Sequence, residues 1–482
     1  MIPERVKPLA EATEELARRF AAAGYSLYIV GGSVRDAILA KSPGAPSSPS
    51  SSPSSPPRSA AQAGQELYQT DIDLTTDARP EAIEEIVTPW ADAVWLQGKL
   101  YGTIGCMRRS RRYEITTHRV ETYRSDSRKP EVLFGDSIEV DLSRRDFTVN
   151  AMALRMPGME LIDPWGGLED LAAGRLRTPL TPEESFSDDP LRMMRAARFI
   201  AGFGFEPVPE LVAAAESLHE RLAIVSPERI RDELDRLLVV PKPSPGLWFL
   251  VRTGLADEFL PELPALELEQ DPIQRHKDVL AHTLAVVDKA SPDRLLRLAA
   301  LLHDIGKPRT RSYGPEGVSF HHHDVVGSRM ARDRMKALHY SGEDIEVVST
   351  LVELHLRFHT YRLGWSDRAV RRYVRDAGPL LERLNELTRC DCTTRNAAKA
   401  RELAERMDEL ESRITELRSL EELDAIRPDL DGNQVMEHLG IRPGRAVGEA
   451  LEFLLDLRLD EGPLGEQEAY RRLDAWWASR ST

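Results

Sequence analysis

The stretch Tyr28-Ile29-Val30-Gly31-Gly32-Ser33-Val34-Arg35-Asp36 decides how the first part of this chain folds. Residues 27–30 form an apolar run typical of a buried β-strand, Gly31-Gly32 interrupts it, and a helical pattern follows from Val34 to Leu39. Two glycines let the backbone approach a phosphate closely, and the start of a helix offers unpaired N–H groups to an anion. Taken alone, the pattern predicts either a phosphate-binding turn or an ordinary turn.

A second stretch, Asp71-Ile72-Asp73-Leu74, places two carboxylates two residues apart in an expected strand. Strand alternation puts both on one face, about 6–7 Å apart along the chain. This spacing suits two Mg²⁺ ions roughly 3.5–4 Å apart, the arrangement used for in-line phosphoryl or nucleotidyl transfer. Because Mg²⁺ keeps several waters, it needs few protein carboxylates. The same pattern also occurs on solvated strand faces, so other motifs are needed to distinguish a metal site from an ordinary surface strand.

Composition limits the class of protein. The 482 residues are 41% apolar and 30% charged, as in ordinary globular chains with several domains. A formal net charge of −15 argues against a general nucleic-acid coat but allows a local basic groove. The cysteines, Cys106, Cys390 and Cys392, lack zinc-site spacing, so we expect reduced thiols in a cytoplasmic protein. We expect no signal peptide or membrane span, because no apolar run approaches 18 residues.

Two further motifs combine acidic and basic side chains. The first is Arg144-Arg145-Asp146-Phe147-Thr148-Val149-Asn150. The second, Ser187 to Phe199, predicts a helix that starts with an N-cap and an early proline. Together with the glycine turn and the aspartate pair, these motifs resemble the head of the class II (bacterial-type) CCA tRNA nucleotidyltransferase and poly(A) polymerase family.

The resemblance implies a role for individual residues. Asp71 and Asp73 would hold Mg²⁺, and Asp146 would accept a hydrogen bond from the ribose 2′-OH, while guanidinium groups suit the triphosphate. Asp188, Asp189 and Arg192 match the family's Glu-Asp-x-x-Arg motif, which reads the base, with Asp in place of the first Glu. The residues implied to bind the nucleotide are Gly31, Gly32, Ser33, Arg35, Arg144, Arg145, Asp146, Asn150, Asp188, Asp189, Arg192, Arg195 and Arg198.

The chemistry of base selection can be argued directly. Asp189 only accepts hydrogen bonds at neutral pH, and Arg192 only donates them. Cytosine and adenine each present an amino donor beside a ring-nitrogen acceptor, whereas uracil and guanine present a carbonyl beside an N–H. The pair therefore predicts selection of C and A, from CTP and ATP, without a nucleic-acid template.

A histidine-rich series begins in the second half of the chain, and it runs His282, His303-Asp304, His321-His322-His323, His355 and Asp391. It resembles the HD phosphohydrolase superfamily, whose histidines and aspartates hold one or two divalent metals. His323 is chosen over its two neighbours because the family histidine lies four residues before a glycine, here Gly327. Imidazole with carboxylate suits Mn, Ni, Co or Fe better than Mg. Bound metal would activate water against a phosphoester, although a metal-holding scaffold without turnover is the alternative. The implied ligands are His282, His303, Asp304, His323, His355 and Asp391.

Several features are left with two interpretations. Glu114 is a candidate third carboxylate or a surface residue on a strand next to Asp73. The arginines at 108, 109, 111 and 112 indicate a solvated hairpin tip or an RNA-backbone contact. Arg229, Arg231, Arg442 and Arg445 are weaker candidates for RNA contacts. The Ser/Pro-rich residues 42–64 predict a mobile inserted loop.

The resemblance implies an α+β protein with a polymerase-beta-like nucleotidyltransferase head (1–168), an all-α neck (169–265), an HD-type helical domain (271–395) and a helical, tRNA-binding tail (396–482). The expected reaction is template-independent addition of CCA to tRNA 3′ ends. The alternatives are a poly(A) polymerase or a CC- or A-adding enzyme, and an HD phosphohydrolase with a degenerate RNA-binding head. The sequence leaves the oligomeric state open.

Overall fold

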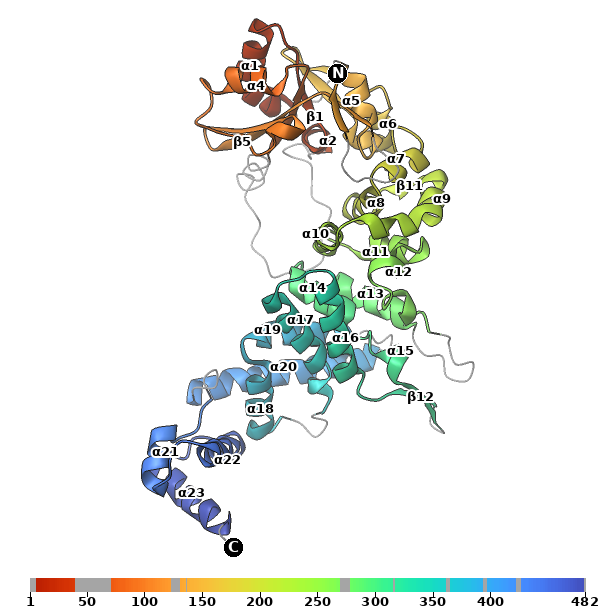
Figure 1. Ribbon diagram of the computed structural model, residues 1–482. Helices are drawn as coiled ribbons and strands as arrows, with labels where there is room; N and C mark the ends of the chain where they lie inside the picture. Colours follow the sequence, from red (N-terminus) through yellow and green to blue (C-terminus); the bar gives the residue numbers. More distant parts are fainter. Residues whose placement is uncertain are drawn as a thin grey trace. The chain divides into compact units, whose positions relative to one another are not determined.

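The computed structural model describes residues 6–39, 71–122, 131–135, 137–268, 278–314, 317–360, 365–392, 397–421 and 426–480. The chain divides into two compact units, Met1–Ser226 with Trp248–Glu258 and Pro227–Leu247 with Phe259–Thr482. The expected order, a mixed α/β part followed by helices, is confirmed (Figure 1). The predicted loop 42–64 and the expected start of the HD segment at residue 271 lie outside the described residues. The finer division into four domains stays a prediction.

The first unit is built on a seven-stranded sheet in the order β3-β4-β5-β2-β1-β8-β9. Only the β2–β5 pair is parallel within this sheet. The strands are β1 (Leu27–Val30), β2 (Ile72–Thr76), β3 (Ala93–Trp95), β4 (Thr103–Arg108), β5 (Arg111–Thr117), β8 (Ala153–Met156) and β9 (Glu160–Ile162). Strand β2 begins at Ile72, so Asp71 directly precedes the strand in which we expected it.

Helices α1 (Lys7–Ala22) and α4 (Pro80–Val87) lie against one face of this sheet (Figure 1). Tyr113 of β5 points to that side, because its hydroxyl donates a 3.1 Å hydrogen bond to the carbonyl of Ala12 in α1. Strand alternation sends Glu114 to the opposite face. Glu114 pairs in register with Asp73, which confirms that the two strands are neighbours.

Other short elements complete the first unit. The short strands are β6 (Arg119–Thr122), β7 (Glu131–Phe134), β10 (Arg175–Leu176) and β11 (Glu206–Pro207). The helices include α2 (Gly32–Leu39), α5 (Ile138–Ser143), α6 (Gly167–Ala173), α7 (Pro182–Asp188), α8 (Leu191–Phe203) and α9 (Pro209–Leu218), with α12 (Leu255–Phe259) at the boundary between the units and α11 (Ser244–Arg252) crossing it.

The predicted N-cap at Ser187-Asp188 is wrong. These residues form the last turn of α7, and a new helix, α8, starts at Leu191. The cause is Pro190, because the residue before a proline avoids the helical region. Asp189 is accordingly extended (φ −135°, ψ 99°), and its carboxylate accepts a 3.2 Å hydrogen bond from the N–H of Leu191.

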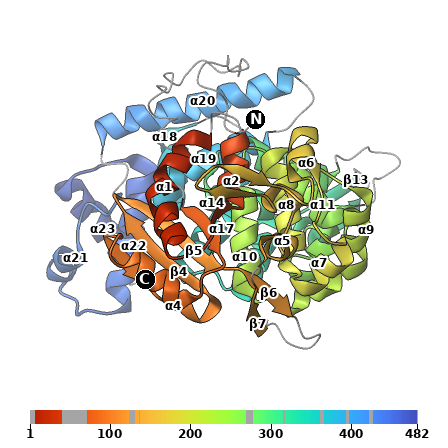
Figure 2. The same ribbon diagram turned by 90° about the horizontal axis from the view of Figure 1, so that it is seen from above.

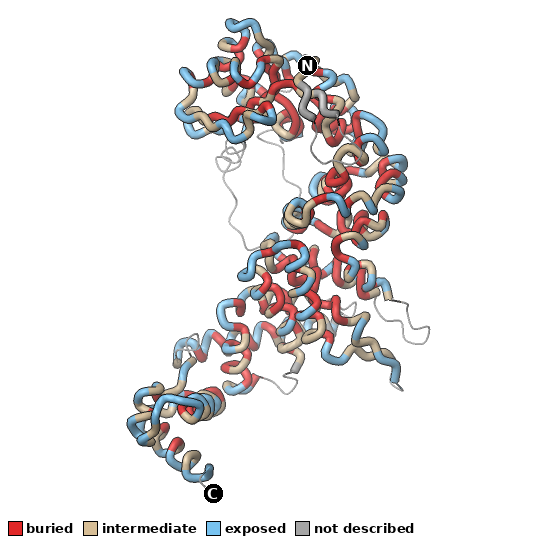
Figure 3. The backbone as a smooth tube through the Cα atoms, in the orientation of Figure 1, coloured by how far each residue is buried: buried red, intermediate tan, exposed pale blue. Residues whose placement is uncertain are grey.

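Among its described residues, the second unit forms helices and a single hairpin of β12 (Arg311–Gly314) and β13 (Gly317–Phe320). Helix α10 has an apolar face, since Ile230, Leu234, Leu237 and Leu238 are all buried. Buried positions line the inner sides of its packed helices (Figure 3). Its helices up to the tail are α10 (Pro227–Leu238), α13 (Val279–Lys289), α14 (Arg294–Leu302), α15 (Lys307–Thr310), α16 (His323–Ala337), α17 (Gly342–Leu354), α18 (Asp367–Ala377), α19 (Leu381–Asp391) and α20 (Ala397–Leu420).

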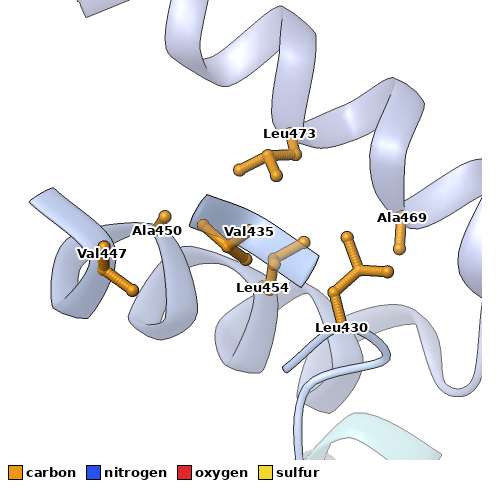
Figure 4. Close-up of a cluster of buried hydrophobic side chains, with 7 residues drawn as sticks. All are labelled: Leu430, Val435, Val447, Ala450, Leu454, Ala469 and Leu473. Carbon is orange, nitrogen blue, oxygen red and sulfur yellow. The ribbon is translucent and has the colours of Figure 1, made fainter. Parts of the chain in front are cut away.

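The part expected to be a helical tail from residue 396 begins with one long helix, α20, which runs beside α18 and α19 (Figure 2). The tail then forms three helices, α21 (Gly432–Leu439), α22 (Arg445–Glu461) and α23 (Glu466–Arg480). They share a small core of their own (Figure 4). Its buried side chains are Leu430, Val435, Val447, Ala450, Leu454, Ala469 and Leu473.

Two expectations concern the whole chain. In the described ranges, every helix is too short or too polar to cross a lipid bilayer. Cys106, Cys390 and Cys392 form no disulfide.

Candidate active site

The turn after β1 needs glycine at its first position. Gly31 has a φ of +68°, a conformation that side chains disfavour, and its carbonyl accepts hydrogen bonds from the N–H groups of Val34 and Arg35. A Cβ on Gly31 would lie 2.9 Å from Nη1 of Arg145 and 3.9 Å from Oδ2 of Asp73. The bare turn therefore brings the backbone against one cationic and one anionic side chain.

The carboxylate of Asp73 faces this turn from β2, and Asp71 directly precedes that strand. Asp73 is half-buried and Asp71 is exposed. Burial raises the pKa of Asp73 to about 6, with Glu114 and Asp71 adding to the rise and Arg145 opposing it. Ser33 joins the two segments, because its hydroxyl donates to the Asp71 carbonyl (3.4 Å) and accepts from the Asp73 N–H (3.3 Å).

Asp146 is almost completely buried and has three partners. Its carboxylate accepts hydrogen bonds from Asn150 Nδ2 (2.9 Å) and the Phe147 N–H (2.8 Å), and it forms an ion pair with Arg195 (2.7 Å). Burial opposes the charge, but Arg195 and Asn150 outweigh it and hold the pKa of Asp146 below its ordinary value. The carboxylate is thus fixed as an acceptor.

Arg144 and Arg145 are both held by one residue, Asp141, which is fully buried. Asp141 accepts hydrogen bonds from Nη2 (2.7 Å) and Nε (3.1 Å) of Arg144, and from Nη2 of Arg145 (3.2 Å). The backbone N–H of Arg119 supplies a fourth hydrogen bond at 3.2 Å. Although burial opposes the charge, Arg145 and Arg144 lower the pKa of Asp141 to about 2.

Arg192 is positioned from two sides. Its Nη1 donates to Ser185 Oγ (2.9 Å) in α7, and its Nη2 donates to the carbonyl of Arg144. The backbone N–H of Arg192 also bonds the carbonyl of Asp189 at 3.0 Å. The predicted base-reading pair therefore lies within one turn, at the junction of α7 and α8.

These groups meet around one cavity of about 360 Å³. Of the residues predicted to bind nucleotide, Ser33, Arg35, Asp188 and Arg198 are not among those that line it. Arg35 instead lies behind the wall, donating a 2.6 Å hydrogen bond to Asn150 Oδ1. The lining residues are Gly31, Gly32, Asp73, Arg144, Arg145, Asp146, Asn150, Asp189, Arg192 and Arg195.

The arginine cluster at 108–112 forms the tip of the β4–β5 hairpin, as one of the two interpretations predicted. Arg109 and Ser110 have positive φ (49° and 64°), and Asp92 forms an ion pair with Arg108 at 3.0 Å. An RNA contact at this tip stays a prediction.

The second unit brings the six predicted HD residues together. His282 lies in α13, His303 and Asp304 directly follow α14, His323 begins α16, His355 follows α17, and Asp391 ends α19. His303, Asp304, His323 and His355 are buried. Two triads, His282-His303-Asp304 and Asp304-His323-His355, each keep their ligand atoms within 4.8 Å of one another.

Three of these histidines are oriented by the same kind of hydrogen bond, from ring nitrogen to backbone carbonyl. The Nδ1 atoms of His303, His323 and His355 bond the carbonyls of Ala300, Phe320 and Val352 at 2.8, 2.7 and 2.6 Å. Their Nε2 atoms are buried and form no well-aligned hydrogen bond, although those of His303 and His323 lie within ion-pair distance of Asp304. Backbone bonds at one ring nitrogen and a buried second nitrogen that forms no aligned hydrogen bond are what metal-binding histidines show, so the cluster fits a divalent metal.

Two carboxylates, those of Asp304 and Asp391, lie next to the histidine nitrogens of the cluster. Asp391 Oδ1 lies 2.9 Å from His282 Nε2, and the two oxygens of Asp304 lie 3.2 Å from His303 Nε2 and 3.4 Å from His323 Nε2. Burial opposes protonation of His303, but Asp304 and Asp391 raise its pKa to about 10. A site that attracts a proton so strongly also suits a metal cation in its place.

Comparison with known proteins gives a polymerase head followed by an RNA-binding segment and an HD domain, in the order that the sequence predicted. Residues 27–177 match the Poly A polymerase head domain, residues 204–266 match a probable RNA and SrmB-binding site of polymerase A, and residues 279–417 match the HD domain. The A-adding tRNA nucleotidyltransferase of Deinococcus radiodurans is 36% identical over 358 residues, which cover 72% of this chain and 80% of that protein. The chain belongs to the tRNA nucleotidyltransferase family.

Other members of the tRNA nucleotidyltransferase family are similar over different extents. A CCA-adding enzyme of Levilactobacillus brevis is 35% identical over 58% of this chain and 63% of that enzyme. The crystal structure of the Bacillus stearothermophilus CCA-adding enzyme in complex with CTP has the same fold, with a TM-score of 0.67 and 24% identity over 98% of this chain and 99% of that chain. The predicted family and the α+β fold are confirmed.

Sequence reasoning missed one residue of this tRNA nucleotidyltransferase that shapes the cavity, namely Asp141. It lies within α5, three and four residues before Arg144 and Arg145. That spacing brings acidic and basic side chains together on a helix and was the available signal.

Proposed function

We propose that this tRNA nucleotidyltransferase adds C, C and A to tRNA 3′ ends from CTP and ATP, without a template. The observation that carries the proposal is the single cavity that joins the carboxylate of Asp73 to two phosphate-suited arginines and to the Asp189–Arg192 pair. Because tRNA is the proposed substrate, the proposed compartment is the cytoplasm.

Each group of the cavity has a proposed task. Arg144 and Arg145, with the backbone of Gly31 and Gly32, bind the triphosphate, because guanidinium forks and bare backbone suit phosphate oxygens. Asp146 accepts a hydrogen bond from the ribose 2′-OH, for which its fixed, charged state prepares it. This hydrogen bond would favour ribonucleotides over deoxyribonucleotides, which lack the 2′-OH.

The carboxylates form an all-oxygen donor set, which fits Mg²⁺. With two Mg²⁺ ions held by Asp71 and Asp73, the site would gain activation of the RNA 3′-OH and charge stabilisation on the leaving pyrophosphate. Glu114 pairs with Asp73 across β5 and β2, and we propose it as a third carboxylate of the same site.

Base selection rests on Asp189 and Arg192. The contacts of Arg192 with Ser185 and Arg144 hold its guanidinium in the cavity wall. An acceptor and a donor at fixed positions match the amino group and ring nitrogen of cytosine or adenine, and they repel the reversed pattern of uracil and guanine.

The test is primer extension with purified protein, Mg²⁺ and a tRNA transcript that ends at the discriminator base. CTP, ATP, both together, UTP and GTP are supplied, and product lengths are read. Three additions with CTP plus ATP, and none with UTP or GTP, are expected. Addition of CC alone would assign a CC-adding activity. Addition of A alone, and only to a transcript that ends in CC, would assign the A-adding activity named for the Deinococcus radiodurans relative. A long ladder with ATP would assign polyadenylation.

The HD cluster supports a second proposal, a metal-dependent phosphohydrolase. The buried Nε2 atoms of His303, His323 and His355 carry it, because all three histidines share a potential metal-binding triad with Asp304. Such a donor set suits Mn, Ni, Co or Fe. Metal bound there would supply an activated water for attack on a phosphoester.

This second proposal is tested by metal analysis of the purified protein and by hydrolysis of bis-(p-nitrophenyl) phosphate with each metal. Wild-type protein is expected to bind metal and to release p-nitrophenol, and His303→Asn to lose both. Metal binding without hydrolysis of this probe would favour the scaffold alternative.

A further inference from the structure

One row of the sheet extends from Asp73 to the sheet edge. Asp73 in β2 pairs with Glu114 in β5, Glu114 pairs with Gly105 in β4, and Gly105 pairs with Trp95 in β3. Paired residues present their side chains to the same face of a sheet, so this row lies on the face opposite α1 and α4. At about 4.8 Å per strand, Trp95 is roughly 14 Å from Asp73 along the row.

Trp95 lies directly on the backbone of Gly105. A Cβ at Gly105 would be 1.9 Å from Trp95 Nε1 and 2.3 Å from Cε2, so any other residue would displace the indole. The missing side chain lets a large aromatic ring lie low on the carboxylate face. Trp95 remains half-exposed in this position.

Arg112 completes a platform with Trp95. Its guanidinium carbon is 5.7 Å from the centre of the indole, within the range of a cation–π contact, and the side chain is exposed. Arg112 pairs with Met107 and lies two residues before Glu114 on β5, so it shares the face of the row. An exposed aromatic ring beside an arginine is the combination that binds single-stranded nucleic acid, by stacking on bases and pairing with phosphates.

The position of the platform relative to the cavity limits what it can contact. Gly31 follows β1, and β1 borders β2 on the side away from β5. The nucleotide cavity therefore lies on the β1 side of Asp73, and the platform lies on the β5 side. In an in-line transfer the attacking hydroxyl and the leaving pyrophosphate are on opposite sides of the reacting phosphorus. A triphosphate bound on the β1 side therefore requires the RNA 3′ end to arrive over β5 and β4.

We infer that Trp95 and Arg112 bind the single-stranded 3′ end of the acceptor RNA. Trp95 stacks on a base upstream of the reacting nucleotide, and Arg112 pairs with a backbone phosphate. This inference rests on the proposed function, since it assumes that the cavity holds the incoming nucleotide. It adds an RNA-contact surface outside the motifs that bind the nucleotide.

The test separates the Michaelis constants for RNA and nucleotide. Trp95→Leu is expected to raise KM for a tRNA transcript ending in CC about tenfold, the size of one lost stacking contact, with KM for ATP unchanged. Trp95→Phe, which keeps an aromatic ring, should restore most of the affinity. Arg112→Gln should lower the slope of log KM for RNA against log salt by about one, as for one lost phosphate contact.

Arg18→Gln is the control for Arg112→Gln. Arg18 is exposed on α1, against the other face of the sheet, so its loss should leave the salt slope unchanged. Should Trp95→Leu not fold, quenching of tryptophan fluorescence by short RNA ending in CC, measured as wild type minus Trp95→Phe, gives an independent readout.

Two outcomes overturn the inference while the proposed function survives. One is a wild-type KM for RNA in Trp95→Leu together with no quenching that depends on Trp95. The other is a rise in KM for ATP equal to the rise for RNA. Absence of nucleotide addition by the wild-type protein would instead refute the proposed function.

Discussion

Asp141 offers a sharp test of how the cavity is built. Asp141→Asn keeps the shape of the side chain but removes the charge that holds Arg144 and Arg145. The pKa of Asp141 falls from 3.8 to about 2. At about 1.36 kcal/mol per pKa unit, the charged carboxylate is stabilised in the folded protein by about 2 kcal/mol. We expect the free energy of unfolding to fall by about that amount, and KM for CTP to rise about tenfold as the arginines lose their orientation.

The chain supplies a matched control for this variant. Asp170 is also fully buried and also binds two arginines, Arg175 at 3.0 Å and Arg177 at 2.9 Å, but neither of these lines the cavity. Asp170→Asn should destabilise the protein without changing KM for CTP. Urea unfolding and steady-state kinetics on both variants give the comparison. Equal KM values for CTP in the two variants would refute a positioning role for Asp141.

The sign of the pH dependence can also be stated. Because folding lowers the pKa of Asp141, its contribution is fully present above pH about 4 and is lost as the pH falls through about 2. The difference in unfolding free energy between wild type and Asp141→Asn should therefore shrink between pH 4 and pH 2. A difference that stays constant over this window would show that the lost stability does not come from the charge.

Three other predictions concern separate parts of the protein. Asp73→Asn should lower kcat for nucleotide addition at least a thousandfold, because it removes a proposed metal ligand. The thermal unfolding midpoint should stay near the wild-type value, because the carboxylate that is removed is half-buried and has a raised pKa. Residual activity within tenfold of wild type would exclude Asp73 as a metal ligand. Gly31→Ala should lose about 1–2 kcal/mol of stability and most nucleotide binding, since φ is +68° and the new Cβ would lie 2.9 Å from Arg145, and calorimetry with CTP measures both effects. His355→Ala should lower the metal content of the protein, measured by mass spectrometry, and leave CCA addition intact, because it changes only the HD cluster of the second unit. Loss of CCA addition in a folded variant would argue that the two sites are coupled.

Much of the candidate site was predictable because its groups lie in short, local patterns. The glycine turn, the aspartate pair and the Arg-Arg-Asp segment each fit within a few residues, and the structure brings the glycines, the Arg-Arg-Asp segment and Asp73 of the pair to one cavity, which Asp71 does not line. The histidine series was predictable for a different reason, its resemblance to the HD superfamily, because its members are spread over residues 282–391 and no short local pattern joins them. The break between α7 and α8 was missed because a cap pattern and a proline break look alike when Asp, Asp and Pro are adjacent.

Contacts made through sheet register could not be read from the sequence. The chain order β1, β2, β3, β4, β5 becomes the spatial order β3-β4-β5-β2-β1, with one parallel pair in an otherwise antiparallel sheet. Nothing local in Trp95 or Gly105 indicates that they share a row with Asp73, because they lie 22 and 32 residues further along the chain. A slip of one residue in the β3–β4 pairing would turn Trp95 to the face covered by α1 and α4. The register that places Asp73 and Glu114 on the face opposite α1 and α4 therefore also places the indole on that face, and this link between the two is what the Trp95 variants test.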